Sequence, residues 1–287
     1  MIKSAPSSVR FLLFDFFRFI IVNKTLIANL VIEMTAKLTS TIITFNEERN
    51  IGRCIDALLP ISDEIIVLDS FSKDKTVEIC REKGVAVLQR KWEGYASAKN
   101  YLNTLAKHEF IFSVDADEMP DKILQNAILD AKNEGFENQL YEVNRLTNYC
   151  GKWIRHSGWY PDVKPRIFPK GKSRWIGEFV HEELVVDGNP LPKLLEGHLL
   201  HYSYYSQEEH RERADKYSQL TAQKLFKKGK KVGFLKPYIS AVGRFIAMYF
   251  IKLGFLDKKA GFTIARISAQ SNIFKYKELR RLHREKI

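Results

Sequence analysis

The stretch HEFIFSVDADEMPD, residues 108–121, places a short apolar run directly before three carboxylates in four positions. Residues 110–114 have the pattern of a buried strand, and Asp115, Asp117 and Glu118 follow at once. Like charges at that density repel one another, and each costs free energy if it is removed from water. These carboxylates therefore either face water or surround a cation, and the flanking sequence decides between the two.

Short apolar runs alternate with helical patterns on the N-terminal side of this stretch. The apolar runs predict strands at residues 38–45, 64–70, 85–89 and 110–114. The segments between them predict helices at residues 47–60, 74–84 and 95–107. Continuous apolar strands that alternate with helices are typical of an α/β fold, in which a parallel sheet is covered on both faces.

Two acidic segments follow predicted strands directly. They are LDSFSKD, residues 68–74, and VDADE, residues 114–118. In open α/β sheets, ligands bind beyond the carboxyl ends of the strands. The carboxylates therefore mark the mouth of a binding site.

The regular alternation of predicted strands and helices ends after Pro120. The sequence predicts a helix from Asp121 to about residue 133, strands within residues 139–154 and an aromatic, loop-like region at 156–184. The aromatic residues can stack on sugar rings or fill a core; they are Trp153, Trp159, Tyr160 and Trp175. Ser206 and Glu209 then form a capping box that predicts a long helix.

Charge is unevenly distributed along the 287 residues, whose net charge is +12. Residues 207–287 hold 20 Lys and Arg against 7 Asp and Glu, whereas residues 1–206 hold 26 against 27. A neutral body with a basic tail indicates an anionic partner, such as membrane phospholipid, nucleic acid or an acidic glycolipid. The three cysteines have no metal-binding spacing and indicate free thiols in a reducing compartment.

An apolar segment within the tail, residues 237–256, carries Arg244, Met248 and Lys252 at four-residue spacing. One polar stripe on an apolar helix suits a position in the membrane interface, and a helix packed on the domain is the alternative. Residues 9–32 are also apolar and long enough to span a bilayer, but Asp15, Arg18 and Lys24 interrupt them. Three interpretations remain for this stretch: a start of translation at Met34, an interfacial segment or a span.

Several short motifs occur in a fixed order, each at a predicted junction of strand and helix. They are TFNEERNIGRCIDALL (44–59), IIVLDSFSKDKT (65–76), GYASAKN (94–100) and the DAD of residues 115–117. This set resembles family 2 glycosyltransferases, which have the Rossmann-like GT-A fold. The resemblance covers about residues 37–186.

The resemblance implies roles for individual residues. Phe45 and Glu47 border the nucleotide base, Asp69 bonds to the base, and Asp115 contacts the ribose. Lys99 occupies the basic position near the diphosphate, and Asp117 is a ligand of a divalent metal, Mg²⁺ or Mn²⁺. The chain departs from the D-D-G-S pattern at Ser70 and Phe71. In this it is similar to a subgroup that builds the lipopolysaccharide inner core.

The segments VHEEL (180–184), HSGWYPD (156–162) and PRIF (165–168) are similar to the same subgroup. Such enzymes need a base for the acceptor hydroxyl, and a carboxylate with a raised pKa is the usual one. We expect Glu182 to be this base, with Glu183 second and Asp162 third. His181 completes the metal site or orients the base.

The resemblance implies an inverting hexosyltransferase that uses a nucleotide sugar, expected to be a UDP-sugar. The expected acceptor is a lipid-linked glycan such as the lipopolysaccharide core, at the cytoplasmic face of the inner membrane, with no nucleic acid partner. Two alternatives remain: a polyisoprenyl-phosphate glycosyltransferase, and a non-catalytic, membrane-associated protein that binds nucleotide sugars. We predict an N-terminal extension at residues 1–36, a GT-A domain at 37–205 and a basic helical region at 206–287.

Overall fold

The computed structural model describes residues 36–177 and 182–285. Four parallel strands form half of its central sheet, in the spatial order β3, β2, β1, β4. Their bounds are β1 Leu38–Thr44, β2 Glu64–Asp69, β3 Ala86–Gln89 and β4 Phe110–Asp115. These are the four predicted strands, so the α/β fold class is confirmed. Residues 1–35, nearly all of the predicted extension, and His181 lie outside the described residues.

Three helices connect these strands: α2 Ile51–Leu58, α3 Thr76–Glu82 and α4 Tyr95–Leu105. Successive residues of a strand point to opposite faces of a sheet. Ile42 therefore packs in a core with α2, whereas Ile43 packs in a second core with α4. Burial explains why β2 and β4 are apolar runs, whereas β3, at the edge of the sheet, is mostly exposed.

The second half of the sheet is mixed. The order continues from β4 through β8, β6 and β11 to β5, and β8 is antiparallel to both β4 and β6. The bounds are β5 Glu118–Pro120, β6 Tyr141–Tyr149, β7 Lys152–Trp153, β8 Val163–Pro169 and β11 Lys193–Tyr204. Helix α5, Lys122–Asn133, follows β5 as predicted.

The region predicted to be loop-like contains regular structure, so that prediction was wrong. Besides β8 it holds the 3-10 turn η1 Lys170–Lys172 and a two-stranded sheet of β9, Ser173–Ile176, and β10, Glu183–Val186. Pro165 lies beside a register shift in the β8–β6 pairing. Proline is tolerated in strands at such irregularities, which explains why a proline-rich segment can still form a strand.

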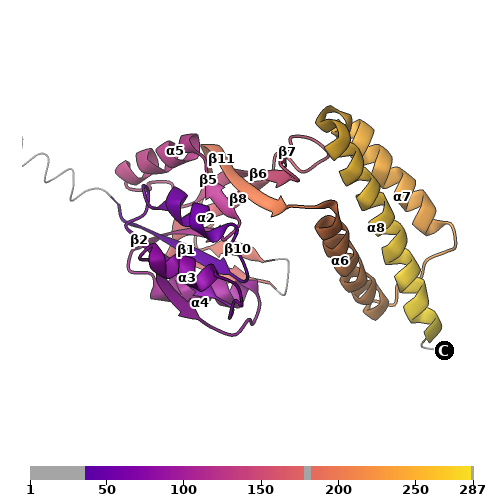
Figure 1. Cartoon of the computed structure of the whole chain (residues 1–287), viewed down its shortest axis with the longest axis horizontal. Helices are drawn as coiled ribbons and strands as arrows, with labels where there is room; N and C mark the ends of the chain where they lie inside the picture. Colours follow the sequence, from indigo (N-terminus) through magenta and orange to yellow (C-terminus); the bar gives the residue numbers. More distant parts are fainter. Residues whose placement is uncertain (1–35, 178–181, 286–287) are drawn as a thin grey trace, which may run out of the picture.

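Three long helices form the C-terminal region. They are α6 Gln207–Lys227, α7 Lys236–Ile246 and α8 Lys258–Glu285, and α8 packs against the other two (Figure 1). The π-helical η2, Ala247–Ile251, and the short η3, Gly254–Asp257, join α7 to α8. The predicted cap of α6 is present, since Ser206 Oγ accepts a hydrogen bond from the Glu209 amide at 3.1 Å.

The C-terminal helices are attached to the sheet domain by buried polar contacts. The Asp257 carboxylate accepts a hydrogen bond from the amide of His156 at 2.9 Å, and the Lys152 ammonium donates to the Asp257 carbonyl at 2.6 Å. Tyr149 and Trp159 pack beside His210 of α6. Burial, together with nearby arginine charges, lowers the pKa of His210 to about 4. Trp159 thus belongs to this junction.

Within the described chain, no single helix has the length and apolar composition needed to cross a membrane. One pair of helical segments, Lys236–Ile251 and Gly254–Glu285, meets those criteria together, with a bend of 73° between them. Cys54 and Cys80 are buried free thiols, and Cys150 is an exposed one, as predicted.

Candidate active site

The three carboxylates at the end of β4 differ in their sets of basic neighbours, although Asp115 and Glu118 share Arg166. Glu118, at the start of β5, is wholly buried and accepts hydrogen bonds from Arg166 at 2.6 Å and Arg145 at 3.3 Å. It also accepts one from the Asp115 amide at 3.1 Å. The two arginines come from β8 and β6, so the mixed half of the sheet holds the acidic turn in place.

Asp115 forms ion pairs with Lys99 Nζ at 3.3 Å and Arg166 Nη2 at 3.5 Å. Burial opposes ionisation of this carboxyl, but the charges of Lys99 and Arg166 outweigh that effect and hold the pKa of Asp115 well below its usual range. Asp115 is therefore a carboxylate at any physiological pH, suited to accept hydrogen bonds from a ligand.

Lys99 lies between two other predicted site residues. Its side chain is only 2% exposed, and its ammonium lies 3.3 Å from both Asp115 Oδ1 and Glu182 Oε1. The Trp175 ring covers it, with 4.7 Å from Nζ to the ring centroid. Asn100, the next residue of α4, exchanges two hydrogen bonds of 2.8 Å with the Trp175 backbone. This contact ties α4 to β9 and fixes the position of the lysine.

The three candidate bases have different surroundings in the structure. Glu182 faces Lys99, whereas Glu183 is exposed in β10. Asp162 pairs with Arg145 at 2.7 Å and Lys164 at 3.0 Å. Burial opposes its ionisation, but those two charges outweigh it and hold the pKa of Asp162 below normal. A carboxylate held in this way is a weak proton acceptor.

Asp117 has a partner that the sequence did not reveal. His201 of β11 places Nε2 3.1 Å from Asp117 Oδ2. Strand β11 pairs with β5 in a register that sets His201 opposite Glu118, and this brings the imidazole to the turn. Only the long-range pairing of β11 with β5 reveals this contact, because a lone histidine 84 residues from Asp117 carries no spacing signal.

Asp117 and His201 fit a divalent metal ion. Two adjacent ligands about 2.1 Å from an octahedral ion lie about 3 Å apart, which matches the observed separation of the two side chains. Asp115 Oδ1 is a buried oxygen nearby that has an ion pair but no hydrogen bond. Among the described residues, no three His, Cys, Asp or Glu side chains are grouped as ligands. The protein would therefore supply few ligands, and phosphate and water oxygens would supply the rest, as is usual for Mg²⁺.

The residues predicted to border the nucleotide base lie at the ends of β1 and β2. Phe45 is exposed, and Asp69 is wholly buried. Asp69 accepts hydrogen bonds from the Ser72 amide and from Gln89 Nε2, both at 2.9 Å. Phe71, which stands where the family has glycine, has φ +61°. Its side chain is thus held exposed in a backbone conformation that glycine favours.

Glu47 lies on the Asp117 side of this region. Its carboxylate accepts a hydrogen bond from Asn50 Nδ2 at 2.6 Å. Burial raises the pKa of Glu47, the Asn50 hydrogen bond opposes this, and the Asp117 charge adds to the rise. Its expected contact with the base stays a prediction.

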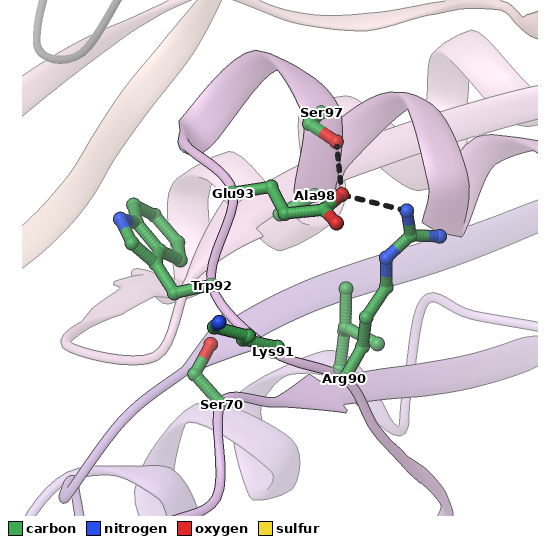
Figure 2. Close-up of a pocket in the computed structure, with 8 residues that line it drawn as sticks. Ser70, Arg90, Lys91, Trp92, Glu93, Ser97 and Ala98 are labelled. Atoms are coloured by element: carbon green, nitrogen blue, oxygen red, sulfur yellow. Dashed lines mark hydrogen bonds and ion pairs between the residues drawn. The ribbon is translucent and has the colours of Figure 1, made fainter.

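A small pocket lies beside the carboxyl ends of β2 and β3, next to the first turn of α4. Its lining includes Ser70, Arg90, Lys91 and Trp92, and the last three were not predicted from the sequence. Figure 2 shows the Glu93 carboxylate lying between Arg90 and Ser97, at 2.7 Å and 3.3 Å. Glu93 offsets the charge of Arg90, and the pocket volume of about 10 Å³ has room for about one water molecule.

Comparisons with known proteins bear on the family of the chain. Residues 41–177 match the model of the family described as "Glycosyl transferase family 2". An uncharacterized glycosyltransferase of Rickettsia bellii is 31% identical over 87% of this chain and 88% of its own length. The lipopolysaccharide core biosynthesis glycosyltransferase LpsC of Rhizobium meliloti is 27% identical over 81% of this chain and 90% of its own length.

Among solved structures, glucosyl-3-phosphoglycerate synthase from Mycobacterium tuberculosis is 20% identical with a TM-score of 0.34. The match covers 41% of this chain and 48% of the synthase, so the aligned region spans about half of that protein.

Proposed function

Because the chain belongs to the family 2 glycosyltransferases, we propose that it transfers a hexose, with inversion, from a UDP-sugar to a lipid-linked glycan. The buried Lys99, held between Asp115 and Glu182, is the observation that carries this proposal. It places a fixed positive charge beside one carboxylate suited to the donor and another suited to the acceptor hydroxyl.

The donor would lie across the carboxyl ends of β1, β2 and β4. Phe45 and Phe71 offer exposed rings for the base, and Asp69 lies behind them at the end of β2. Asp115 would accept hydrogen bonds from the ribose, and Lys99 would lie beside the diphosphate. Asp117 and His201 would hold Mg²⁺ or Mn²⁺, and the bound ion would supply positive charge for the departing diphosphate.

The proposed transfer step depends on the position of Glu182. Its carboxylate takes the proton of the acceptor hydroxyl, and that oxygen forms a bond to the anomeric carbon from the face opposite the nucleotide. The bond from the anomeric carbon to the diphosphate oxygen breaks, and its electron pair leaves with the diphosphate. Lys99 donates hydrogen bonds to the charge that develops there, an effect that is strong in a site without water.

Similarity to LpsC supports a lipopolysaccharide core as the acceptor. An acceptor of this kind would place the enzyme at the cytoplasmic face of the inner membrane. A polyisoprenyl phosphate remains the alternative acceptor. A non-catalytic binder of nucleotide sugars would not need an aligned base such as Glu182.

The test is Glu182→Gln, measured by UDP release and sugar transfer with purified lipopolysaccharide core as acceptor. Loss of a general base should lower transfer about 100-fold or more, while donor binding persists. Glu183→Gln is the matched comparison, because Glu183 is adjacent but exposed, and it should leave transfer nearly unchanged. If Glu182→Gln transfers normally, or if Glu183→Gln is the inactive variant, the assignment of the base is wrong.

A further inference from the structure

One side of the α7–η2 segment carries an exposed apolar stripe. Leu235, Ile239, Val242 and Ile246 follow one another at spacings of three or four residues, which places them on one helical face, and Phe250 in the π-helical η2 is also exposed. Their side chains are between 44% and 65% exposed. The opposite face is buried through Pro237, Ala241 and Met248. A soluble helix normally buries its apolar face, whereas this one is apolar on both sides.

The exposed surface continues beyond α7. Phe234, Ile251, Leu253, Phe255 and Leu256 are also at least 44% exposed. Together with the stripe they form what we call the α7 face. Single exposed apolar residues are common, but ten of them within residues 234–256 indicate an interaction site.

The chain around the α7 face is strongly basic. Residues 228–266 contain nine Lys and Arg, all exposed, and a single acid, Asp257, which is buried against His156. In the parts of the chain that the structure describes, none of these nine side chains has an ion-pair partner; they are Lys228, Lys230, Lys231, Lys236, Arg244, Lys252, Lys258, Lys259 and Arg266. They are therefore available to an anionic partner.

We propose that the α7 face docks on the surface of an anionic phospholipid bilayer. The apolar stripe would enter the boundary between headgroups and acyl chains, and the lysines beside it would contact lipid phosphates. A second copy of the chain is a poorer occupant, because it would bring the same nine cations to the interface. This inference rests on the surface of α7 and does not require the proposed reaction.

The segment lies on the bilayer rather than across it. Helix α8 is held on the protein side by hydrogen bonds, since Ser271 Oγ contacts Ser218 Oγ at 2.6 Å and Asn272 Nδ2 donates to Ser240 Oγ at 3.2 Å. Figure 1 shows α7 at the outer edge of the helical region, with α6 and α8 nearer the sheet. Docking through α7 would thus leave the strand ends in water, where a glycan can reach them.

The experiment is vesicle flotation of the full chain without donor or acceptor. Vesicles of phosphatidylcholine alone are compared with vesicles that contain about 30% phosphatidylglycerol. Binding should require the anionic lipid and should fall at least tenfold in about 0.5 M NaCl, because salt screens the lysine–phosphate attraction. The variant Ile239→Glu/Ile246→Glu should bind at least tenfold more weakly. The control Ile123→Glu/Leu191→Glu, also at exposed apolar positions, should bind within twofold of wild type.

A fluorescent label locates the contact directly. In a Cys150→Ser background, Val242→Cys and Leu191→Cys are each labelled with an environment-sensitive dye. Anionic vesicles should shift the emission of the dye to the blue at position 242 and leave it unchanged at position 191. This readout remains valid if the Glu variants fold poorly, and it separates the α7 face from any membrane contact made elsewhere.

Three results would overturn the proposal. One is equal vesicle binding by wild type and the α7 variant. Another is an unshifted dye at position 242 when the protein is bound. A third is a wild-type dimer in light scattering that the α7 substitutions convert to a monomer while no variant binds vesicles, since the face would then be a subunit interface.

Discussion

Replacing Lys99 with methionine removes one buried charge and leaves most of the side-chain volume. The ammonium lies 3.3 Å from two carboxylates and is almost wholly buried. Breaking a buried pair costs about 3–5 kcal/mol, because the partner is left without compensation. Asp115 keeps its contact with Arg166, so we expect about 3 kcal/mol, at the lower end of that range. Transfer should fall about 100- to 1000-fold in kcat, as for loss of a donor that contacts developing charge.

The stability loss should depend on pH in a defined direction. The folded pKa of Asp115 lies below the unfolded value of about 3.9, so its ionised form stabilises the fold above that pH. This contribution disappears as pH falls through about 4 toward the folded pKa. Lys99→Met removes the largest charge that lowers the pKa of Asp115. The difference in unfolding free energy between wild type and variant should therefore be largest near pH 7 and smaller below about pH 4.

Urea denaturation at several pH values, followed by tryptophan fluorescence, measures this difference. Lys107→Met is the control, because Lys107 also forms an ion pair with a glutamate, at 3.5 Å, but is 79% exposed. It should cost less than about 1 kcal/mol. If Lys99→Met is as stable as Lys107→Met at pH 7, or if its deficit grows as pH falls, the account of the Lys99 charge is refuted.

Two further predictions concern metal and nucleotide. Asp117→Asn and His201→Gln should each weaken Mn²⁺ binding about tenfold or more in calorimetry with MnCl₂. The control Asp187→Asn, at an exposed position, should leave Mn²⁺ binding unchanged. Unchanged Mn²⁺ affinity in both site variants would contradict the assigned ligands. Asp69→Asn should raise the KM for the donor about tenfold with little change in kcat, because contact with the base stabilises ground state and transition state alike; an unchanged KM with a collapsed kcat would oppose this role.

Local sequence patterns predicted the parallel half of the fold. Strands β1, β2 and β4 are largely buried, and β2 and β4 appear as apolar runs bounded by helical spacing, whereas β1 mixes threonine and serine with isoleucine and β3 is a mostly exposed edge strand. The antiparallel strand β8 was missed because two prolines mask its pattern. Its place in the sheet depends on pairing with β4 and β6, and no local signal reports such pairing.

Site residues whose positions depend on strand pairing could not be predicted from the sequence either. The resemblance to a family identified Lys99, Asp115 and Glu182, which the structure brings together. It did not identify Arg145, Arg166 or His201, because their positions depend on the registers of β6, β8 and β11. The four-residue spacing also led to a wrong prediction for the α7 segment. Met248 is buried, although it was predicted to share a polar stripe with Arg244 and Lys252. Residues four apart stop sharing a face where the helix becomes π-helical at η2.

The charges around the acidic turn are consistent with the metal ion of the proposed reaction. Lys99, Arg145, Lys164 and Arg166 are its nearby cations, and Asp115, Glu118 and Asp162 pair with them. Glu182 shares Lys99 with Asp115, and within the described residues Asp117 pairs with His201. The five carboxylates thus exceed the four fixed positive charges by one. A divalent ion beside Asp117 and a proton taken up by Glu182 are the two ways to remove that excess, and both belong to the proposed reaction. Asp117 and Glu182 are therefore the carboxylates at which the proposed reaction would supply the missing positive charge.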